Sequence, residues 1–278
     1  MTEKGSSRNI KLLIAYDGTD FSGWQTQNTW KAQKTRETSQ KNPAAFPREA
    51  PRRTVQGCIE EALQKLHKHP VSLAGSGRTD AGVHAAGQIA NFYTDIQSIA
   101  PDRFTPALNS LLPRDVRILA AEETHSGFHA RFDAKARTYR YHIIAGRHAF
   151  PHELRYALQL WNCPSVERLN SYARLLRGEM DCSSFATPKD PSESRFRYIF
   201  NACFFVQGDA LVFEITANAF LWKMVRSITG TLLFCEEKGV SVSEFQSLVG
   251  GKDRSKAGPT APPQGLSLWN IEYGGAYR

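Results

Sequence analysis

The sequence lacks the patterns that mark a disulfide framework or a membrane span. Its five cysteines are odd in number, scattered singly and without a C-x-x-C pair, which indicates a reducing compartment and argues against disulfides and a cysteine zinc site. No apolar run reaches the ~18 residues that a membrane helix needs. Residues 1–9 contain no apolar signal core. We therefore expect a cytoplasmic protein with no membrane segment.

Two signatures of metal and nucleotide chemistry are also missing. The histidines at 125 and 129, and those at 148 and 152, lie in loop or strand context, so neither pair matches the helical H-E-x-x-H pattern of a zinc site. The stretch GSGRTDAG lacks the G-x-x-x-x-G-K-[ST] spacing of a phosphate-binding loop, and the pattern after it predicts a strand instead of a helix. Both absences argue against a metal centre and a nucleoside-triphosphate site.

Positive charge is what the composition supplies. The chain has 278 residues, enough for one large domain or two ordinary ones, and a formal net charge of +8. Such an excess favours a polyanionic partner, with nucleic acid as the first choice and an anionic membrane surface as the second.

Hydrophobic periodicity predicts a similar order of elements in the two halves of the chain. The first half is expected to contain strands at 10–16, on both sides of the turn within 73–92, and at 116–123, with helices at 54–68 and within 101–113. The second half is expected to contain strands at 137–146, 197–208, 210–218 and 266–273, with helices at 166–178, 221–238 and 243–251. Thr54 is the expected N-cap of the first helix.

These patterns predict the α+β class. Two tandem split β-α-β halves, of the ferredoxin-like or RRM-like type, would join in a mostly antiparallel central sheet with helices on one face. We place the halves at residues 1–126 and 127–278. The two halves share the order of their elements but no repeated sequence.

One segment, residues 28–53, interrupts the first half. It is polar, rich in Lys, Arg, Thr and Pro, and without periodicity. Its composition favours a mobile surface loop. A basic arm that contacts nucleic acid is the alternative.

The stretch LAGSGRTDAGVHAAGQIANF, residues 73–92, predicts two strands joined by a turn of small residues. Arg78 and Asp80 are two positions apart, so in an extended chain they would leave the same face and form an ion pair. A guanidinium beside a carboxylate favours its ionised form, which suits a nucleophile or a base. The competing interpretation is that Asp80 only forms the turn.

Two further motifs combine cations with apolar or aromatic residues. In ARTYRYH, Arg137, Tyr139 and Tyr141 would share one face of a strand, as in a sheet that stacks bases, although a buried tyrosine face is a common alternative. In NAFLWKMVRSITGTLL an apolar stripe predicts a helix, and Lys223 and Arg226 would be neighbours on another face. The ordinary interpretation of those two cations is a solvated helix face.

Together these motifs resemble the TruA-type tRNA pseudouridine synthases. The stretch GSGRTDAGVHAAGQIANF is similar to the long signature of that family. Supporting matches follow in order along the chain: YDGTDFSGWQTQ, TVQGCIEEAL, ALNSLLP, FHARFDAKARTYRY, SSFA, FLWKMVRSITGTLL and APPQGLSLWNIEY. Residues 28–53 resemble an insertion where the family usually has a short turn, and Lys223 stands where a histidine is frequent in the family.

The resemblance implies an enzyme that isomerises uridine to pseudouridine in the anticodon arm of tRNA, at about positions 38 to 40, on a nucleotide flipped out of its stack. It implies no cofactor and no metal. It also implies a homodimer, in which one tRNA contacts both subunits, and a basic cleft between the two halves. We expect that cleft on the sheet face opposite the helices.

The resemblance also implies roles for individual residues. Asp80 matches the catalytic aspartate, and Arg78 the arginine that enters the space vacated by the flipped nucleotide. Tyr139 matches the tyrosine that stacks on the target base, and Arg226 the arginine that pairs with the aspartate. Lys223 is included as a substrate-binding residue.

Two other functions remain as alternatives. A non-catalytic RNA-binding protein on the same sheet would bind tRNA in a salt-sensitive way and give no product. A hydrolase acting on a glycosidic bond would use Asp80 and release free uracil. Such enzymes usually bring a second carboxylate as the acid, and no convincing partner lies near Asp80 in the sequence.

Overall fold

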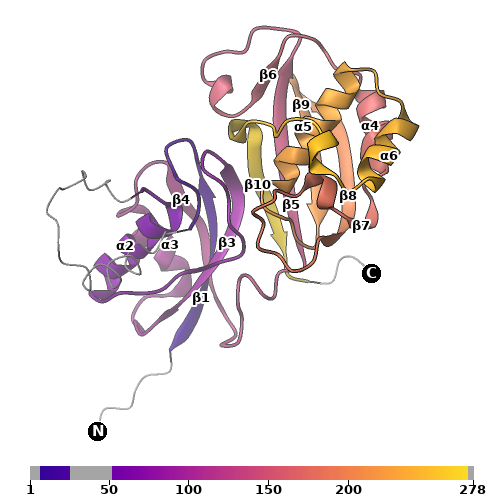
Figure 1. Ribbon diagram of the computed structural model, residues 1–278. Coiled ribbons are helices and arrows are strands. Elements are labelled where there is room, and N and C mark those ends of the chain that lie inside the picture. Colours follow the sequence, from indigo (N-terminus) through magenta and orange to yellow (C-terminus); the bar gives the residue numbers. More distant parts are fainter. Residues whose placement is uncertain (1–6, 26–51, 275–278) are drawn as a thin grey trace, which may run out of the picture.

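The computed structural model describes residues 7–25 and 52–274, which form one large sheet with helices packed against it (Figure 1). The strands are β1 Arg8–Tyr16, β2 Ala74–Gly75, β3 His84–Thr94, β4 Val116–Thr124, β5 Ala136–Ala145, β6 Leu158–Leu160, β7 Gly178–Asp181, β8 Phe196–Gln207, β9 Ala210–Ala217 and β10 Leu266–Glu272. The α-helices are α2 Val55–His67, α3 Phe104–Asn109, α4 Val166–Arg174, α5 Met224–Glu237 and α6 Val242–Gly250.

The sheet is mixed and mostly antiparallel. Its strands follow the order β4-β1-β3-β10-β5-β9-β8-β7, with β2 beside β3 and β6 beside β5. Parallel pairing occurs between β10 and β3 and between β5 and β6. Strand β10 comes last in the chain but lies between β3 and β5, so it joins the strands of the first half to those of the second (Figure 1).

Two buried apolar clusters hold the helices against the sheet. In the first cluster, Ile59 and Leu63 of α2 pack with residues of β1 such as Leu12. In the second cluster, Ile228 of α5 and Phe245 of α6 pack against β5, β8 and β9. The α+β class and the antiparallel sheet predicted from periodicity are therefore confirmed. Figure 1 shows α2 and α3 at one end of the sheet and α4, α5 and α6 at the other.

Both groups of helices lie on the same face of the sheet. Residues directly opposite each other on neighbouring strands share a face. One such row crosses the sheet through Tyr16, Ala85, Leu268, Tyr139, Ile215 and Ala202. The first members of this row belong to the first cluster and the last two to the second, while Tyr139 packs against both. The face that carries Tyr139 is therefore the one that the helices cover.

Several predicted boundaries were wrong. Helix α5 begins at Met224 instead of Leu221, because Trp222 and Lys223 form a turn in which Lys223 has a left-handed φ of 61°. The short strands β6 and β7 were not predicted, since three or four residues are too few to show an alternation. Thr54 is confirmed as the N-cap of α2: its hydroxyl accepts a hydrogen bond from the amide of Gly57 at 3.3 Å.

Gly230, in the middle of α5, lets this helix lie against the segment 259–261. A Cβ at this position would stand 1.8 Å from the carbonyl oxygen of Pro259. This oxygen belongs to the backbone, so no side-chain rotation can relieve the clash. We expect Gly230→Ala to lower the free energy of unfolding by about 2–3 kcal/mol, measured by urea denaturation. Gly250→Ala is the matched control, because nothing lies within 4 Å of a Cβ at the end of α6. Equal stability of both variants would contradict the close approach.

Candidate functional site

Asp80 lies in the turn between β2 and β3, and the loop at residues 16–24 packs against this turn. The amide of Trp24 donates to the carbonyl of Thr79 at 3.2 Å, and the hydroxyls of Tyr16 and Thr79 are 2.8 Å apart. Gly23 has a φ of 99°, and a Cβ there would lie 2.5 Å from the Thr79 carbonyl oxygen. The YDGTDFSGW segment, residues 16–24, thus holds the backbone of the Asp80 turn in place.

The carboxylate of Asp80 has a partner on each oxygen. Oδ2 accepts a hydrogen bond from Nη1 of Arg226 at 2.9 Å, and Oδ1 accepts one from the indole Nε1 of Trp222 at 2.8 Å. The side chains of Asp80 and Arg226 are 18% and 13% exposed, so the ion pair is sheltered but reachable from solvent. Trp222 and Arg226, which follow Asp80 by 142 and 146 positions in the sequence, therefore both contact its carboxylate.

Arg226 is held in place by the segment that precedes β10. Its Nε donates to the carbonyl of Ala261 at 2.8 Å, and the amide of Ala261 donates to the carbonyl of Arg226 at 3.0 Å. One guanidinium thus connects helix α5, the 259–261 segment and Asp80. This double anchoring fixes the direction from which positive charge approaches the carboxylate.

Tyr139, on β5, lies beside the ion pair on the helix-covered face. Its ring meets that of Phe220 edge to face, with centroids 5.1 Å apart. Burial raises the pKa of the Tyr139 hydroxyl above its ordinary value, and the negative charge of Asp80 raises it further. The hydroxyl is therefore protonated at neutral pH. Within the part of the chain that the structure describes, it has no hydrogen-bond partner.

The predicted pairing of Arg78 with Asp80 was wrong. Residues 76–83 form a turn instead of a continuous strand, so the rule that places positions i and i+2 on one face does not apply there. Arg78 is exposed, and among residues 7–25 and 52–274 it forms no ion pair. Its guanidinium therefore has no acidic partner in the part of the chain that the structure describes.

Lys223 does not contact Asp80 in the described structure. Its Nζ lies 4.9 Å from the centre of the Trp222 ring, an arrangement that attracts a cation to the face of the indole. Lys223 and Arg226 therefore do not line one helix face as predicted, because Lys223 precedes the first turn of α5.

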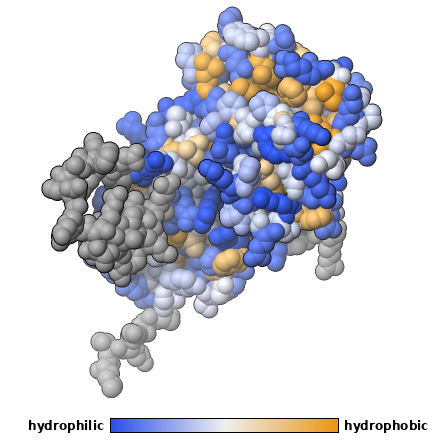
Figure 2. Space-filling model, viewed as in Figure 1, coloured by the Kyte–Doolittle hydropathy of each residue, from blue (hydrophilic) through white to orange (hydrophobic). Residues whose placement is uncertain are grey.

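The expected position of the cleft also needs correction. Tyr139, Asp80 and Arg226 gather on the face that carries the helices, between the two helix groups, and not on the opposite face. The reason is that Arg226 projects from α5 itself, so the cation could not reach the far side of the sheet. On the face seen in Figure 2, hydrophilic side chains predominate across the middle of the molecule.

Sequence reasoning missed Trp222 as a member of the site. Trp222 precedes the first turn of α5, so its approach to Asp80 depends on the turn at residues 222–223, which no local pattern in the sequence signals. The basic segment 28–53 lies outside the described residues except for Arg52 and Arg53. Arg53 forms a bidentate ion pair with Asp115, with N–O distances of 2.7 and 2.8 Å.

Asp17, at the end of β1, ties the loop under Asp80 to the second half of the chain. Its carboxylate accepts hydrogen bonds from Nε of Arg155 at 2.6 Å and from the hydroxyl of Tyr156 at 2.9 Å. It also accepts from the amide and hydroxyl of Thr19. Burial alone would raise the pKa of Asp17, but these hydrogen bonds outweigh it and lower the pKa to about 2.

A stability difference that depends on pH follows from this cluster. The folded pKa of Asp17 lies below its unfolded value of about 4. The carboxylate therefore contributes its full stability to the folded state above about pH 4, and this contribution is lost as pH falls toward about 2. We expect Asp17→Asn to lower the free energy of unfolding by about 1–3 kcal/mol at pH 7, a gap that closes in acid. Urea denaturation at a series of pH values measures both.

Asp253→Asn serves as the control for Asp17→Asn. Asp253 accepts similar local hydrogen bonds, from Ser255, but it does not connect the two halves of the chain in this way. A smaller loss is therefore expected. Equal stability of Asp17→Asn and the wild type at pH 7 would contradict the role given to the cluster.

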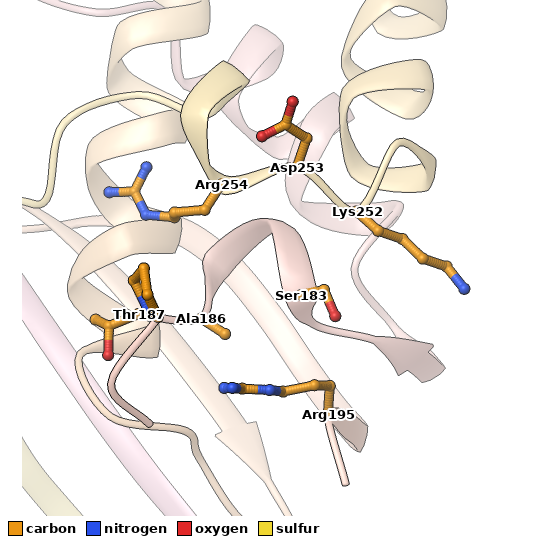
Figure 3. A pocket seen from close by; sticks show the side chains of 8 residues that line it. Ser183, Ala186, Thr187, Arg195, Lys252, Asp253 and Arg254 are labelled. Carbon is orange, nitrogen blue, oxygen red and sulfur yellow. The ribbon is translucent and has the colours of Figure 1, made fainter. Parts of the chain in front are cut away.

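A pocket of about 310 Å³ lies elsewhere, in the second half of the chain (Figure 3). In Figure 3, Arg195 and Arg254 extend on the side of Thr187, whereas Lys252 and Asp253 point outward. These cations already have partners: Lys252 pairs with Asp181 at 3.0 Å, and Arg254 donates to the carbonyl of Gly258 at 2.9 Å. None of the predicted site residues lines this pocket.

Two features are absent from the part of the chain that the structure describes. In the described residues, no three or more His, Cys, Asp or Glu side chains gather in a group that could hold a metal ion. No helix among them is long and apolar enough to cross a membrane. The contacts of Asp80 are a guanidinium and an indole, whereas a glycoside hydrolase pairs two carboxyl groups across the bond that it breaks.

Comparison with known proteins agrees with the motifs. A sequence model of the family described as tRNA pseudouridine synthase matches residues 12–133 and 172–274. The tRNA pseudouridine synthase A of Treponema denticola is 50% identical over 268 residues, 96% of this chain and 94% of the relative. That of Treponema pallidum is 46% identical over 260 residues, 94% and 87% of the two chains. That of Brachyspira hyodysenteriae is 39% identical over 262 residues, 93% and 95%.

Proposed function

Because the chain belongs to the tRNA pseudouridine synthase family, we propose that it converts uridine to pseudouridine in the anticodon arm of tRNA, at about positions 38 to 40, after the target nucleotide leaves the stack. Asp80 is the catalytic carboxylate of this proposal. The observation that carries it is the sheltered ion pair between Asp80 and Arg226, with Tyr139 beside it on the same face.

The reaction requires a carboxylate at the sugar of the target nucleotide. The N1–C1′ bond of uridine breaks, the uracil turns, and a C5–C1′ bond forms. The C5 proton then leaves, and N1 gains a proton, so substrate and product are isomers and no redox partner is consumed. Asp80 can act by attacking C1′ or by removing a proton from C2′. In either case, Arg226 holds the carboxylate through Oδ2, while its own guanidinium is anchored to the carbonyl of Ala261.

Tyr139 supplies a surface on which the uracil can turn. Stacking on an aromatic ring returns about 1–3 kcal/mol per base, which offsets part of the few kcal/mol that flipping costs. A ring face tolerates rotation of the base, whereas directed hydrogen bonds to one edge would oppose it. The edge-to-face contact with Phe220 keeps the Tyr139 ring in one orientation.

Two further cations, Arg78 and Lys223, complete the substrate-binding surface of the proposal. Arg78 is exposed in the Asp80 turn, so its guanidinium can enter the gap that a flipped nucleotide leaves. Lys223 follows Trp222 directly and places an ammonium group near the phosphates of a bound strand. The net charge of +8 favours association with tRNA in the same way.

The remaining proposals concern organisation. We propose that residues 1–126 and 127–278 are two split β-α-β halves, and that the substrate lies between their helix groups. We also propose a cytoplasmic homodimer in which one tRNA contacts both subunits.

The test is incubation of the purified protein with unmodified tRNA, followed by mapping of pseudouridine along the molecule. Conversion confined to the anticodon arm at about positions 38 to 40 is the expected result. Binding without product would favour a non-catalytic RNA-binding protein, and release of free uracil would indicate a hydrolase. Conversion elsewhere in the tRNA would overturn the proposed substrate position.

A further inference from the structure

Both oxygens of the Asp80 carboxylate already accept a hydrogen bond in the free protein. One partner is sheltered and anchored, and the other is exposed. Arg226 holds Oδ2, with a side chain only 13% exposed and a second bond to Ala261. Trp222 holds Oδ1, yet this residue is 43% exposed. Displacing Arg226 would break an anchored ion pair. Displacing the indole breaks one hydrogen bond at the surface, so Oδ1 is the oxygen that a substrate can reach.

We propose that Trp222 is a positioning residue that occupies Oδ1 of Asp80 in the free protein and is displaced by the ribose of the target nucleotide. This inference rests on the proposed function, because it takes Asp80 as the group that meets the sugar. The indole N–H then fixes the plane of the carboxylate before substrate arrives and keeps other ligands from Oδ1.

The backbone of Trp222 is fixed, so the exchange needs only rotation of its side chain. Its amide donates to the carboxylate of Asp190, whose side chain is 1% exposed. Asp190 also accepts from the amide of Ser192 at 2.8 Å and lies 3.5 Å from Nη1 of Arg195. These contacts hold the Asp190 carboxylate, and with it the turn that carries the indole.

The displaced ring would remain next to the substrate. Lys223, with its left-handed φ of 61°, turns the chain so that its ammonium lies over the indole, 4.9 Å from the ring centre. An indole beside a cation is a favourable neighbour for an unstacked base and its phosphate. Trp222 is thus placed to exchange one contact with Asp80 for contact with the RNA.

The first test is Trp222→Phe, which removes the N–H but keeps an aromatic ring. Since substrate no longer has to break the bond to Oδ1, we expect KM for unmodified tRNA to fall about three- to tenfold, with kcat within about twofold of the wild type. A fall in kcat with unchanged KM would show that the bond persists during the reaction and would overturn the displacement. Unchanged KM and kcat would overturn it as well, because no competition would exist.

The second test reads the indole directly and does not need catalysis. The chain has five tryptophans, and the fluorescence change on adding tRNA should be largely lost in Trp222→Phe. Trp161→Phe is the control, because Trp161 is 70% exposed and contacts His148 instead of Asp80. Its fluorescence response to tRNA and its activity should match those of the wild type. An unchanged response in Trp222→Phe would overturn the proposal.

The two proposals fail separately. A wild-type protein that binds tRNA, shows the Trp222 fluorescence change and forms no pseudouridine would end the proposed function but retain the movement of the indole. A wild-type protein that forms pseudouridine with an unresponsive Trp222 would retain the function and end this inference. A thermal unfolding midpoint close to the wild-type value confirms that each variant is folded.

Discussion

Asp80→Asn is expected to reduce pseudouridine formation by at least about 10³-fold, because an amide can neither attack C1′ nor take a proton from C2′. Its carbonyl oxygen can still accept a hydrogen bond from Arg226 or Trp222, so the turn should keep its shape. Affinity for tRNA should remain within about threefold, since the phosphate contacts that dominate binding are untouched. Pseudouridine mapping and a tRNA-binding titration measure the two effects.

Asp115→Asn provides the matched control for this variant. Asp115 is also an aspartate paired with an arginine, Arg53, but neither residue contacts the Asp80 carboxylate, whose partners are Arg226 and Trp222. The control should retain wild-type activity, even if it is less stable. Full activity of Asp80→Asn would refute Asp80 as the catalytic carboxylate. A parallel loss of activity in Asp115→Asn would trace the effect to folding.

Tyr139→Ala and Tyr139→Phe are expected to have the second largest effects. Alanine removes the surface on which the base stacks and leaves a cavity beside Phe220, so activity should fall by at least about 10²-fold and stability by about 3 kcal/mol. Phenylalanine keeps the ring. It deletes a hydroxyl without a hydrogen-bond partner among the described residues, so it should cost no stability.

The activity of Tyr139→Phe decides the role of the hydroxyl. We expect a loss of at least about tenfold, because the hydroxyl has no hydrogen-bond partner among the described residues and is therefore available to the substrate. If Asp80 attacks C1′, its negative charge disappears in the covalent intermediate, and one cause of the raised pKa of Tyr139 disappears with it. The hydroxyl then becomes easier to ionise at the stage where the C5 proton must leave.

Tyr93→Phe is the control for the hydroxyl deletion. Tyr93 is 48% exposed, and its hydroxyl donates to the carbonyl of Ser126 at 2.6 Å. This control should keep full activity. Activity of Tyr139→Phe equal to the wild type would mean that the tyrosine contributes by stacking alone.

The sequence predicted the elements that show a period, and missed those that depend on distant contacts. The face of α2 that contains Ile59 and Leu63 is buried as its spacing indicates, because burial itself imposes that spacing. The start of α5 was misplaced because nothing in the local pattern reveals the left-handed φ of Lys223. The register that brings β10 between β3 and β5 is likewise set by strands far apart in the sequence.

The same distinction applies to the site. Reasoning from spacing chose Arg78 as the partner of Asp80, because it considered only neighbours in the chain. The family resemblance pointed to Arg226, and the structure contains that ion pair. Trp222 was overlooked, since its contact with Asp80 joins residues 142 positions apart and depends on the turn before α5. Residue types in a motif therefore suggested the chemistry, while the pairing of charges required the fold.

The central position of β10 has a consequence for how the protein is made. Ribosomes release a chain from its N-terminus onward, so β3 and β5 are synthesised long before the strand that lies between them. Until residues 266–272 emerge, no strand forms the backbone hydrogen bonds that connect β3 with β5. The segment that precedes β10 and anchors Arg226 is then either not yet made or not yet attached to the sheet. The ion pair between Asp80 and the anchored Arg226 can therefore be completed only after residues 266–272 have been synthesised, although Asp80 itself is made much earlier.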